Sequence, residues 1–321
     1  MYRLKQKLIV CILLIGCLSW QLSCLPSIGM VIFSYNRALQ LNGLLDSIAQ
    51  HVDGLDYVTV IFRASTDEHQ HAYRQIMEQF VDVKFVLQQN APSDFKPILI
   101  NELCAFVADF VIFAVDDIVV KSAIDLRYCV SLLESTGAYG FYLRLGTNIQ
   151  ECYSAQSCFC TGRCSCQNAV QAQPEFTSVT PCVIKWRFDL GQLDWNYPNN
   201  VDMTLYRMQD VCDIVKSLHY NGPNLFESAW SGMSRQASNE YGICFHTSKV
   251  VNIPMNRVQA VWHNRSMNLY SPDDLLHIYN SGSKLDIKLL SDMCNRSAHM
   301  DYEPSFVDRN GDEQICICNK K

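Results

Sequence analysis

The sequence predicts an α/β fold, in which a mostly parallel β-sheet carries helices on both faces and a less regular C-terminal region follows. Short apolar segments rich in β-branched residues alternate with segments whose apolar residues recur at helical spacing, four times between residues 28 and 136. The predicted strands are apolar throughout, which is typical of a sheet covered on both faces. After Gly140 the regular alternation ends.

The first predicted strand is IGMVIFSY, and the segment after it, NRALQLNGLLDSIAQHV, has leucines at helical spacing. Three more strand–helix pairs follow, so the chain predicts βαβ units and parallel pairing. Their strands are YVTVIFRA (57–64), VKFVLQ (83–88) and FVIFAV (110–115), and their helices are DEHQHAYRQIMEQFV (67–81), KPILINELCAFV (96–107) and KSAIDLRYCVSLLEST (121–136). In the second half, GFYLRLGTNI (140–149) predicts a strand and SPDDLLHIYNSGSKLDIKLL (271–290) two helices joined by a turn.

Composition narrows the class of protein. The chain has 321 residues, 49% of them hydrophobic, and a formal net charge of -6, so it forms a sizeable core and shows no basic footprint for nucleic acid. The sequence contains no GxGxxG, GxxxxGK[ST] or GxSxG motif. These absences argue against a dinucleotide oxidoreductase, a P-loop NTPase and an α/β-hydrolase.

The N-terminus predicts membrane attachment. Arg3, Lys5 and Lys7 precede the apolar run LIVCILLIGCLSWQLSCL (8–25), which is close to the shortest length for a spanning helix. We interpret residues 1–26 as a membrane anchor or signal segment, with an uncleaved single-pass anchor preferred. A cleaved or lipidated signal peptide and a buried first helix are the alternatives.

Polar residues follow three of the predicted strands. Asp116 and Asp117 come directly after FVIFAV, Ser34 to Arg37 end the first strand, and Arg63 and Ser65 end the second. The carboxyl ends of parallel strands form the ligand edge of such a sheet, so we expect these side chains to converge. Adjacent carboxylates suit Mg²⁺ or Mn²⁺, whose remaining ligands are commonly substrate phosphates and water. The alternative is that one aspartate caps the next helix and the other faces solvent.

At this point the chain resembles a known family. SIGMVIFSYNRALQLNGLLDSI (27–48), followed further on by FAVDD (113–117), is similar to nucleotide-sugar-dependent glycosyltransferases of the GT-A fold, family 2-like. The resemblance covers residues 28–121 and continues more loosely to Arg309. It departs from the family's Asp-x-Asp motif at Val115, which leaves Val-Asp-Asp and puts the role of the first carboxylate in doubt.

The resemblance implies a metal and a donor pocket. Asp116 and Asp117 would bind Mn²⁺ or Mg²⁺ with the donor diphosphate, and His263 would be a third metal ligand or a structural histidine. Tyr35, Asn36 and Arg37 would lie near the base and ribose of the donor, and Arg63 and Ser65 would border the same pocket. For Arg37, Arg63 and Ser65 the alternative is an ordinary surface residue.

The second half is expected to hold the acceptor. Arg144 is either paired structurally or directed at an anionic group such as a diphosphate. Glu227 is the first choice for the base that deprotonates an acceptor hydroxyl and Asp202 the second; the alternative for Glu227 is an ordinary first-turn helix residue. Sugar-binding surfaces combine flat aromatic faces with carboxylates, so the candidates for contact with the acceptor are Trp186, Trp195, Tyr197 and Asp202. The alternative for the aromatic residues is that they form part of the core.

Sixteen cysteines are unusually many for a cytosolic enzyme and favour an oxidising compartment with disulfides. Five of them, Cys152, Cys158, Cys160, Cys164 and Cys166, fall in ECYSAQSCFCTGRCSCQ. We interpret this segment as a disulfide-stapled insertion at 152–166; a zinc site is the alternative, although the C-x2-C spacing is missing.

Together these features divide the chain into an anchor or signal (1–26), a nucleotide-sugar-binding half (27–140), an acceptor and catalytic half (141–310) and a tail (311–321). The expected function is metal-dependent transfer of a sugar from a nucleotide-diphosphate donor to a glycan, lipid or protein hydroxyl. A metal-dependent nucleotidyl- or phosphotransferase and a non-catalytic, disulfide-rich surface module are the alternatives.

Overall fold

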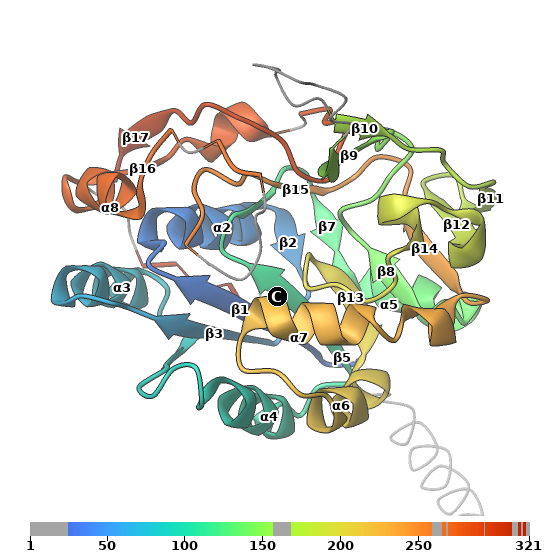
Figure 1. Ribbon diagram of the computed structural model, residues 1–321, viewed down its shortest axis with the longest axis horizontal. Helices are drawn as coiled ribbons and strands as arrows, with labels where there is room; N and C mark the ends of the chain where they lie inside the picture. The colour runs from blue at the N-terminus through green and yellow to red at the C-terminus, as the bar shows by residue number, and fades with distance from the viewer. Residues whose placement is uncertain are drawn as a thin grey trace, which may run out of the picture.

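A large β-sheet forms the centre of the molecule (Figure 1). The computed structural model describes residues 25–156, 168–258, 265–267, 269–291, 293–309, 314, 315, 317 and 318. Within these residues the main sheet has nine strands, in the order β11-β12-β14-β8-β13-β5-β1-β3-β4. Their bounds are β1 (Ile28–Tyr35), β3 (Tyr57–Arg63), β4 (Lys84–Leu87), β5 (Phe110–Val115), β8 (Gly140–Tyr142), β11 (Thr177–Thr180), β12 (Val183–Arg187), β13 (Thr204–Arg207) and β14 (Tyr241–Phe245).

The sheet is mostly parallel in direction. β1 pairs in parallel with both β3 and β5, β3 with β4, and β14 with β8. The pairings of β13 and β12 with their neighbours are antiparallel, so of the described sheet strands only these two run against the rest. The prediction of an α/β fold with a mostly parallel sheet is therefore confirmed.

Helices cover both faces of the sheet, and Figure 1 shows α2 above it and α4 and α6 below. One core contains side chains of α2, α3, α5 and α8, whereas a second core contains those of α4, α6 and α7. The helices are α2 (Ala38–His51), α3 (Asp67–Gln79), α4 (Phe95–Ala105), α5 (Leu126–Thr136), α6 (Met208–Ser217), α7 (Pro223–Ser231) and α8 (Pro272–Asn280).

The two cores explain why the strands are apolar throughout. Side chains of a strand point alternately to its two faces. Along β1, Met30 and Ile32 belong to the first core, while Val31 and Phe33 belong to the second. Because both faces of the strand are buried, polar residues are disfavoured at the positions that face either core. The strand is therefore apolar along its length.

Short ladders and turns complete the fold. β6 (Ile118–Val120) pairs with β15 (Val250–Asn252), and this ladder holds the C-terminal segment beside the end of β5. The other short elements are β2 (Val52–Asp53) with β7 (Ile124–Asp125), β9 (Glu151–Gln156) with β10 (Asn168–Val170), β16 (Ser283–Leu285) with β17 (Phe306–Asp308), and the 3₁₀ turns η1 (Phe188–Leu190), η2 (Leu193–Asn196), η3 (Ser234–Ala237) and η4 (Ile287–Leu290).

Two predicted elements differ from the structure. The strand predicted at 140–149 ends at Tyr142, because the chain then turns and Arg144 reaches Asp194 instead of continuing the ladder. Of the second helix predicted within 271–290, the described residues form only the 3₁₀ turn η4. The chain turns at Gly282, which has φ 92°, and Ser283–Leu285 pairs as β16 with β17, so tertiary pairing overrides the local helical spacing.

The predicted N-terminal anchor lies outside the described residues, since these begin at residue 25. None of the helices in the described ranges has both the length and the apolar character required to cross a bilayer. The membrane attachment and the domain division therefore stay predictions.

Tight packing at β14 gives a test of the sheet. Gly242 lies opposite Trp186 of β12, and a Cβ at this position would stand 2.6 Å from the Trp186 ring. We expect Gly242→Ala to lower the free energy of unfolding by about 1–3 kcal/mol, because the buried ring has no room to move. Urea unfolding measures it; Gly222→Ala, where no atom lies within 4 Å of the added Cβ, is the control. Equal stability of the two variants would contradict the packing.

Candidate active site

Asp116 fixes the ends of two neighbouring strands. The last residues of β1 and β5 are side by side in the parallel ladder, with Phe33 opposite Val115. Oδ2 of Asp116 accepts hydrogen bonds from Ser34 Oγ at 2.8 Å and from the Tyr35 backbone N–H at 3.2 Å, and Oδ1 accepts one from Arg37 at 2.9 Å. Both oxygens of this buried carboxylate are therefore engaged with the protein, and its predicted metal role stays a prediction.

Asp117 is more open to a ligand. Its Oδ2 accepts a hydrogen bond from Arg37 Nη1 at 3.2 Å, but its Oδ1 is buried and has no hydrogen-bond partner. The backbone carbonyl of Asp117 accepts a hydrogen bond from the Ile253 N–H at 2.8 Å, which holds the loop against β15. A buried carboxylate oxygen without a partner costs free energy, so this atom is available to accept a hydrogen bond or to bind a cation.

Arg37 connects these carboxylates to the C-terminal segment. Its Nη1 contacts both Asp116 and Asp117, its Nε donates to Asn256 Oδ1 at 2.9 Å, and its Nη2 donates to the Asn256 carbonyl. Burial, the largest single influence, lowers the pKa of Arg37, but the two aspartates outweigh it and the pKa is raised. The guanidinium is thus a fixed positive charge at the strand ends.

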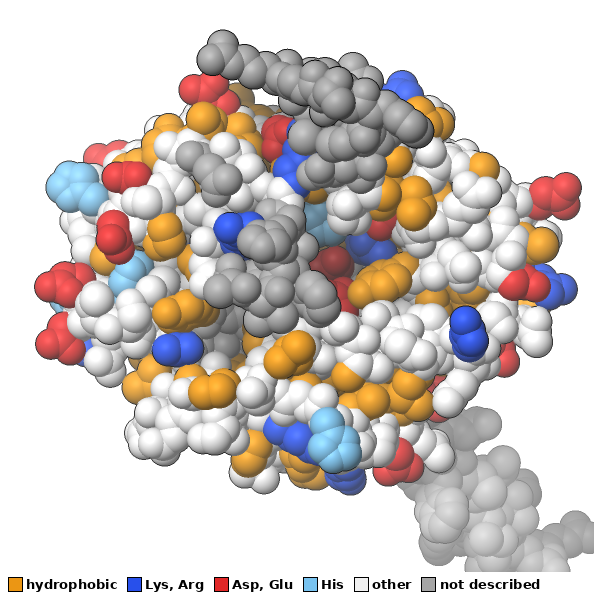
Figure 2. All heavy atoms as spheres, in the orientation of Figure 1, with side chains coloured by type: hydrophobic (Ala, Val, Ile, Leu, Met, Phe, Trp, Pro, Cys, Tyr) orange, Lys and Arg blue, Asp and Glu red, His pale blue; other side chains and the backbone are white. Residues whose placement is uncertain are grey.

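Three adjoining cavities lie along this edge. The strand-end cavity, of about 200 Å³, is lined by Tyr35, Arg63 and apolar side chains; the central cavity, of about 430 Å³, by Asp117, Asn252 and Arg257; and the acidic cavity, of about 470 Å³, by Arg144, Asp194 and Tyr197. Figure 2 shows a hollow on this face with acidic and basic side chains inside it. Neighbouring cavities share lining residues: Arg37, Val115 and Asn224 for the first two, and Ser154, Asp202, Asn224, Glu227 and His299 for the last two.

The strand-end cavity brings together three of the five residues predicted to surround a nucleotide. Tyr35, Arg37 and Arg63 line it, and the Arg63 guanidinium lies 4.7 Å from the centre of the Tyr35 ring. Asn36 and Ser65 bond to each other instead, with Asn36 Nδ2 donating to Ser65 Oγ at 2.6 Å and the Ser65 N–H donating to Asn36 Oδ1 at 2.9 Å. This pair joins the two loops beside the cavity.

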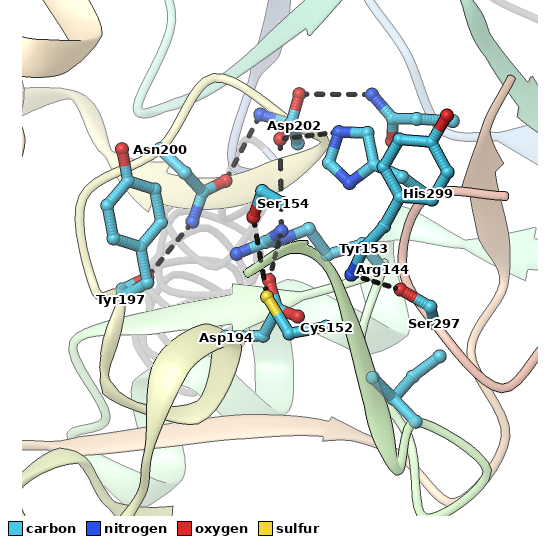
Figure 3. Close-up of polar contacts among 12 residues, drawn as sticks. Arg144, Cys152, Tyr153, Ser154, Asp194, Tyr197, Asn200, Asp202, Ser297 and His299 are labelled. Atoms are coloured by element: carbon cyan, nitrogen blue, oxygen red, sulfur yellow. Dashed lines mark hydrogen bonds and ion pairs between the residues drawn. The ribbon is translucent and has the colours of Figure 1, made fainter. Parts of the chain in front are cut away.

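Arg144 lies in the acidic cavity, among carboxylates. Figure 3 shows its guanidinium between Asp194 and Asp202. The Nη1 atom is 3.1 Å from Asp194 Oδ1 and 3.8 Å from Asp202 Oδ2, and Nε and Nη2 have no hydrogen-bond partner although the side chain is only 2% exposed. Of the two alternatives, structural pairing is what the described residues show. Burial lowers the pKa of Arg144, but Asp194 and Asp202 outweigh it and the pKa is raised.

Glu227 faces the junction of the central and acidic cavities. It lies on α7, whose Phe226 and Trp230 are buried in the second core, so the helix is held with Glu227 toward the cleft. Its Oε1 is 3.4 Å from the Val201 N–H. Burial, followed by the charge of Asp202, raises the pKa of Glu227 to about 8, against the lowering effect of Arg144. A carboxyl with this pKa is suited to exchanging a proton near neutral pH.

Asp202 lies within the same junction. Its Oδ1 accepts a hydrogen bond from Asn252 Nδ2 at 3.2 Å, and its Oδ2 is 4.0 Å from His299 Nε2 (Figure 3). The His299 ring stacks on Tyr153, with 6.1 Å between ring centres. The two carboxylates predicted as candidate bases, Glu227 and Asp202, are thus brought together.

Two of the predicted sugar-binding aromatics are core residues. Trp186 is 1% exposed and Trp195 0% exposed. Their rings meet at 5.0 Å, Trp186 Nε1 donates to the Trp195 carbonyl at 2.9 Å, and neither ring lines the acidic cavity. The prediction that they contact a sugar is wrong, because they fill the space beneath β12 and β14. Tyr197, from the same segment, does line the cavity.

The central cavity offers oxygen atoms for a hard cation. Oδ1 of Asp117 and Oδ1 of Asn252 are both buried without a hydrogen-bond partner, and oxygen ligands are those that Mg²⁺ and Mn²⁺ prefer. In the part of the chain that the structure describes, no three His, Cys, Asp or Glu side chains gather to hold a metal by themselves. His263 lies outside the described residues, so its predicted role as a ligand stays a prediction.

The cysteines that the structure describes form no disulfide. Cys104, Cys129, Cys152, Cys182, Cys212, Cys244, Cys294 and Cys318 are free thiols. The predicted disulfide-stapled segment falls mostly on residues 157–167, outside the described residues, so the stapling stays a prediction.

Several residues of the cleft were not selected from the sequence, among them Asp194, Asn252, Asn256 and His299. Asp194 was overlooked in the aromatic segment that supplied Asp202. Asn252 and Asn256 come from a stretch without periodicity, which reaches the site because β15 pairs with β6. His299 arrives through a bridge to Asn252, and no local pattern marks it.

Comparisons with known proteins add a similarity to glycosyltransferases. The chain is 28% identical over 281 residues to the bifunctional glycosyltransferase pgtA of Dictyostelium discoideum, which covers 78% of this chain and 35% of that protein. The chain thus spans about a third of the length of this curated relative. No family model matches the chain.

Two solved structures align with parts of the chain. S. aureus TarS aligns with a TM-score of 0.43 and 15% identity over 68% of this chain and 34% of TarS. The mannosyltransferase PcManGT of Pyrobaculum calidifontis, solved with GDP-Man and Mn²⁺, aligns with a TM-score of 0.32 and 19% identity over 41% of this chain and 42% of that chain.

The raised pKa of Glu227 predicts a pH-dependent gain in stability for Glu227→Gln. The pKa is about 8 in the folded protein against an ordinary 4.5, so ionisation favours unfolding increasingly as the pH rises from 4.5 to 8. Because glutamine does not ionise, we expect the variant to unfold with a free energy about 3 kcal/mol higher at pH 7 and an unchanged one at pH 4.

Denaturant unfolding across this pH range measures the difference. Glu134→Gln, which makes the same change on an exposed part of α5, is the control and should show no such trend. A pH-independent difference for Glu227→Gln would contradict the raised pKa.

Proposed function

We propose that the protein is a nucleotide-sugar-dependent glycosyltransferase that transfers a sugar to a hydroxyl acceptor and uses Mn²⁺ or Mg²⁺. The observation that supports this most is the order of groups along one cleft. A partly apolar cavity at the strand ends leads to the unpartnered oxygen of Asp117, and then to the carboxyl of Glu227 at the entrance of the acidic cavity.

The donor fits the first two cavities. The strand-end cavity offers Phe33, Ile61 and Tyr35 as apolar and aromatic surface for a base, at the carboxyl ends of parallel strands where nucleotides bind in α/β sheets. The diphosphate would lie in the central cavity, where Arg257 is an exposed cation facing it.

The metal would be held by Asp117, with Asn252 as a second oxygen donor and Asp116 in support through Arg37. Once bound, it would offset the negative charge that develops on the departing diphosphate. Arg37 would position the diphosphate indirectly. It pairs with Oδ2 of Asp117 and so holds in place the carboxylate that would bind the metal.

Glu227 is the proposed base, and Asp202 the second candidate. The Glu227 carboxylate would take the proton of the acceptor hydroxyl while the acceptor oxygen bonds to the anomeric carbon. The bond between that carbon and the diphosphate breaks, and the nucleoside diphosphate leaves with the electron pair. Asp202 accepts a hydrogen bond from Asn252, and would therefore keep Glu227 at a fixed position relative to the proposed metal ligands.

The similarity to pgtA supports the reaction class, since that protein is a bifunctional glycosyltransferase. Its shared region is about a third of its length, so which of its activities corresponds to this chain is left to experiment.

The first test concerns Asp117. Incubation of the protein with a panel of UDP- and GDP-linked sugars and Mn²⁺ should release nucleoside diphosphate, and Asp117→Asn should lower the rate by about 100-fold or more, since the diphosphate loses its metal ligand. Asp189→Asn, which changes an exposed aspartate paired with Arg187, is the control. Release of nucleoside monophosphate with pyrophosphate would instead indicate a nucleotidyltransferase, and no turnover of any donor would reject the proposal.

The second test concerns the pH profile. Because the base must be ionised and its pKa is about 8, the rate of transfer should rise about tenfold per pH unit between pH 5.5 and 7.5 and level off above 8. In Glu227→Gln the remaining rate should be low and should lack this rise. A wild-type rate independent of pH over this range would argue against Glu227 as the base.

A further inference from the structure

Arg144 holds hydrogen-bond donors that the protein leaves unused. Its side chain is 2% exposed and lines the acidic cavity, yet only Nη1 has partners, while Nε and Nη2 have none. A buried donor without a partner is destabilising, and buried polar groups in native proteins are nearly always satisfied. We therefore expect these two groups to donate hydrogen bonds to a ligand that carries acceptor atoms.

The charges around Arg144 indicate what kind of acceptor atom that is. Asp194, Asp202 and Glu227 all lie close enough to raise the pKa of Arg144. Asp194 and Asp202 by themselves already outnumber the one guanidinium among the described residues of this cavity. A phosphate or carboxylate would enter a site of net negative charge, whereas a hydroxyl accepts from the arginine and donates to a carboxylate at the same time.

The dimensions of the cavity favour a ring over a single hydroxyl-bearing side chain. Its volume is about 470 Å³, within the range of small-molecule pockets. The Tyr197 ring lies on its wall, 5.8 Å from the Arg144 guanidinium, and offers a flat apolar surface. Ser154, Ser228 and Ser231 line the remainder with small polar groups.

We propose that the acidic cavity binds the acceptor as a neutral saccharide of one or two rings, with Arg144 as a hydrogen-bond donor to its hydroxyls and Asp194 and Asp202 as hydrogen-bond acceptors. Uronic acids and phosphorylated sugars are excluded by the surplus of carboxylates. This assignment rests on the proposed function, because it names the substrate that presents its hydroxyl to Glu227.

Binding of saccharides without a donor tests the assignment directly. Saturation-transfer NMR and titration calorimetry would compare neutral disaccharides, such as lactose and cellobiose, with their uronic-acid and phosphorylated counterparts. The full chain should bind at least one neutral disaccharide and bind its charged counterparts at least tenfold more weakly. Equal or tighter binding of the charged sugars overturns the proposal, and so does the absence of binding by either class.

Two variants make the test specific to Arg144 and its charge. Arg144→Lys keeps a cation beside Asp194 and Asp202 but removes the guanidinium fork, so saccharide affinity should fall about tenfold. Arg187→Lys, which alters an exposed arginine paired with Asp189, is the matched control. An unchanged affinity in Arg144→Lys, with folding verified by circular dichroism, overturns the role of Arg144.

Asp194→Asn removes one negative charge while an amide remains to bond with Gln171, the other partner of Asp194. It should shift the preference toward uronic acids by about tenfold relative to the wild type. No shift would contradict the charge argument even if neutral sugars bind.

These experiments distinguish a failure of the proposed function from a failure of the acceptor assignment. If neutral saccharides bind but no nucleotide sugar is consumed, the cavity is a saccharide site and the transfer reaction is rejected. If a nucleotide sugar is consumed but only charged or non-saccharide acceptors are glycosylated, the transfer reaction stands and the neutral-saccharide assignment is rejected.

Discussion

The cleft depends on one buried arrangement of charges, the Arg37 guanidinium between Asp116, Asp117 and Asn256. It joins three parts of the chain that are far apart in sequence: the end of β1, the end of β5 and the segment after β15. A buried charge pair is costly to desolvate, so it is maintained only when every member is hydrogen-bonded. Ser34 and the Tyr35 N–H meet this requirement for Asp116. Oδ1 of Asp117 is left without a hydrogen-bond partner, in a residue that lines the central cavity.

The same principle separates the two neighbouring aspartates. On sequence alone they are equivalent carboxylates at a strand end, and the missing acid at position 115 makes their roles harder to assign. In the structure Asp116 has both oxygens engaged by protein donors, while Asp117 has one oxygen engaged. The first therefore organises the site and the second is available to a cation, a division of labour that depends on the side-chain directions and not on the motif.

Sequence reasoning was successful where local pattern determines structure. The strands β1, β3 and β5 are apolar runs because both their faces are buried, and their polar ends converge because parallel strands share one edge. Glu227 could be selected by the same reasoning, because it is a carboxylate that follows a turn and lies near the start of a helix. Trp186 and Trp195 were misjudged, since composition does not distinguish a buried aromatic ring from one that faces a ligand. Asn252 and His299 were out of reach, because long-range pairing alone brings them to the cleft.

The proposed function gives the distribution of charge along the cleft a meaning, because it would provide the two substrates with separate places. Arg37, Arg257 and Arg265 line the central cavity, whereas Arg144 is the one arginine among the described residues of the acidic cavity and is matched there by more carboxylates than it neutralises. The described lining of the central cavity thus has three arginines for the carboxylates of Asp117, Asp202 and Glu227, whereas the acidic cavity has one arginine for three carboxylates. Under the proposed function, an anionic diphosphate would meet less repulsion in the first cavity, and a neutral polyhydroxyl molecule would meet no such penalty in the second. Because Asp202 and Glu227 line both cavities, the proposed base lies at the boundary between them. Under the proposed function, the two substrates would meet at this boundary between the two charge environments.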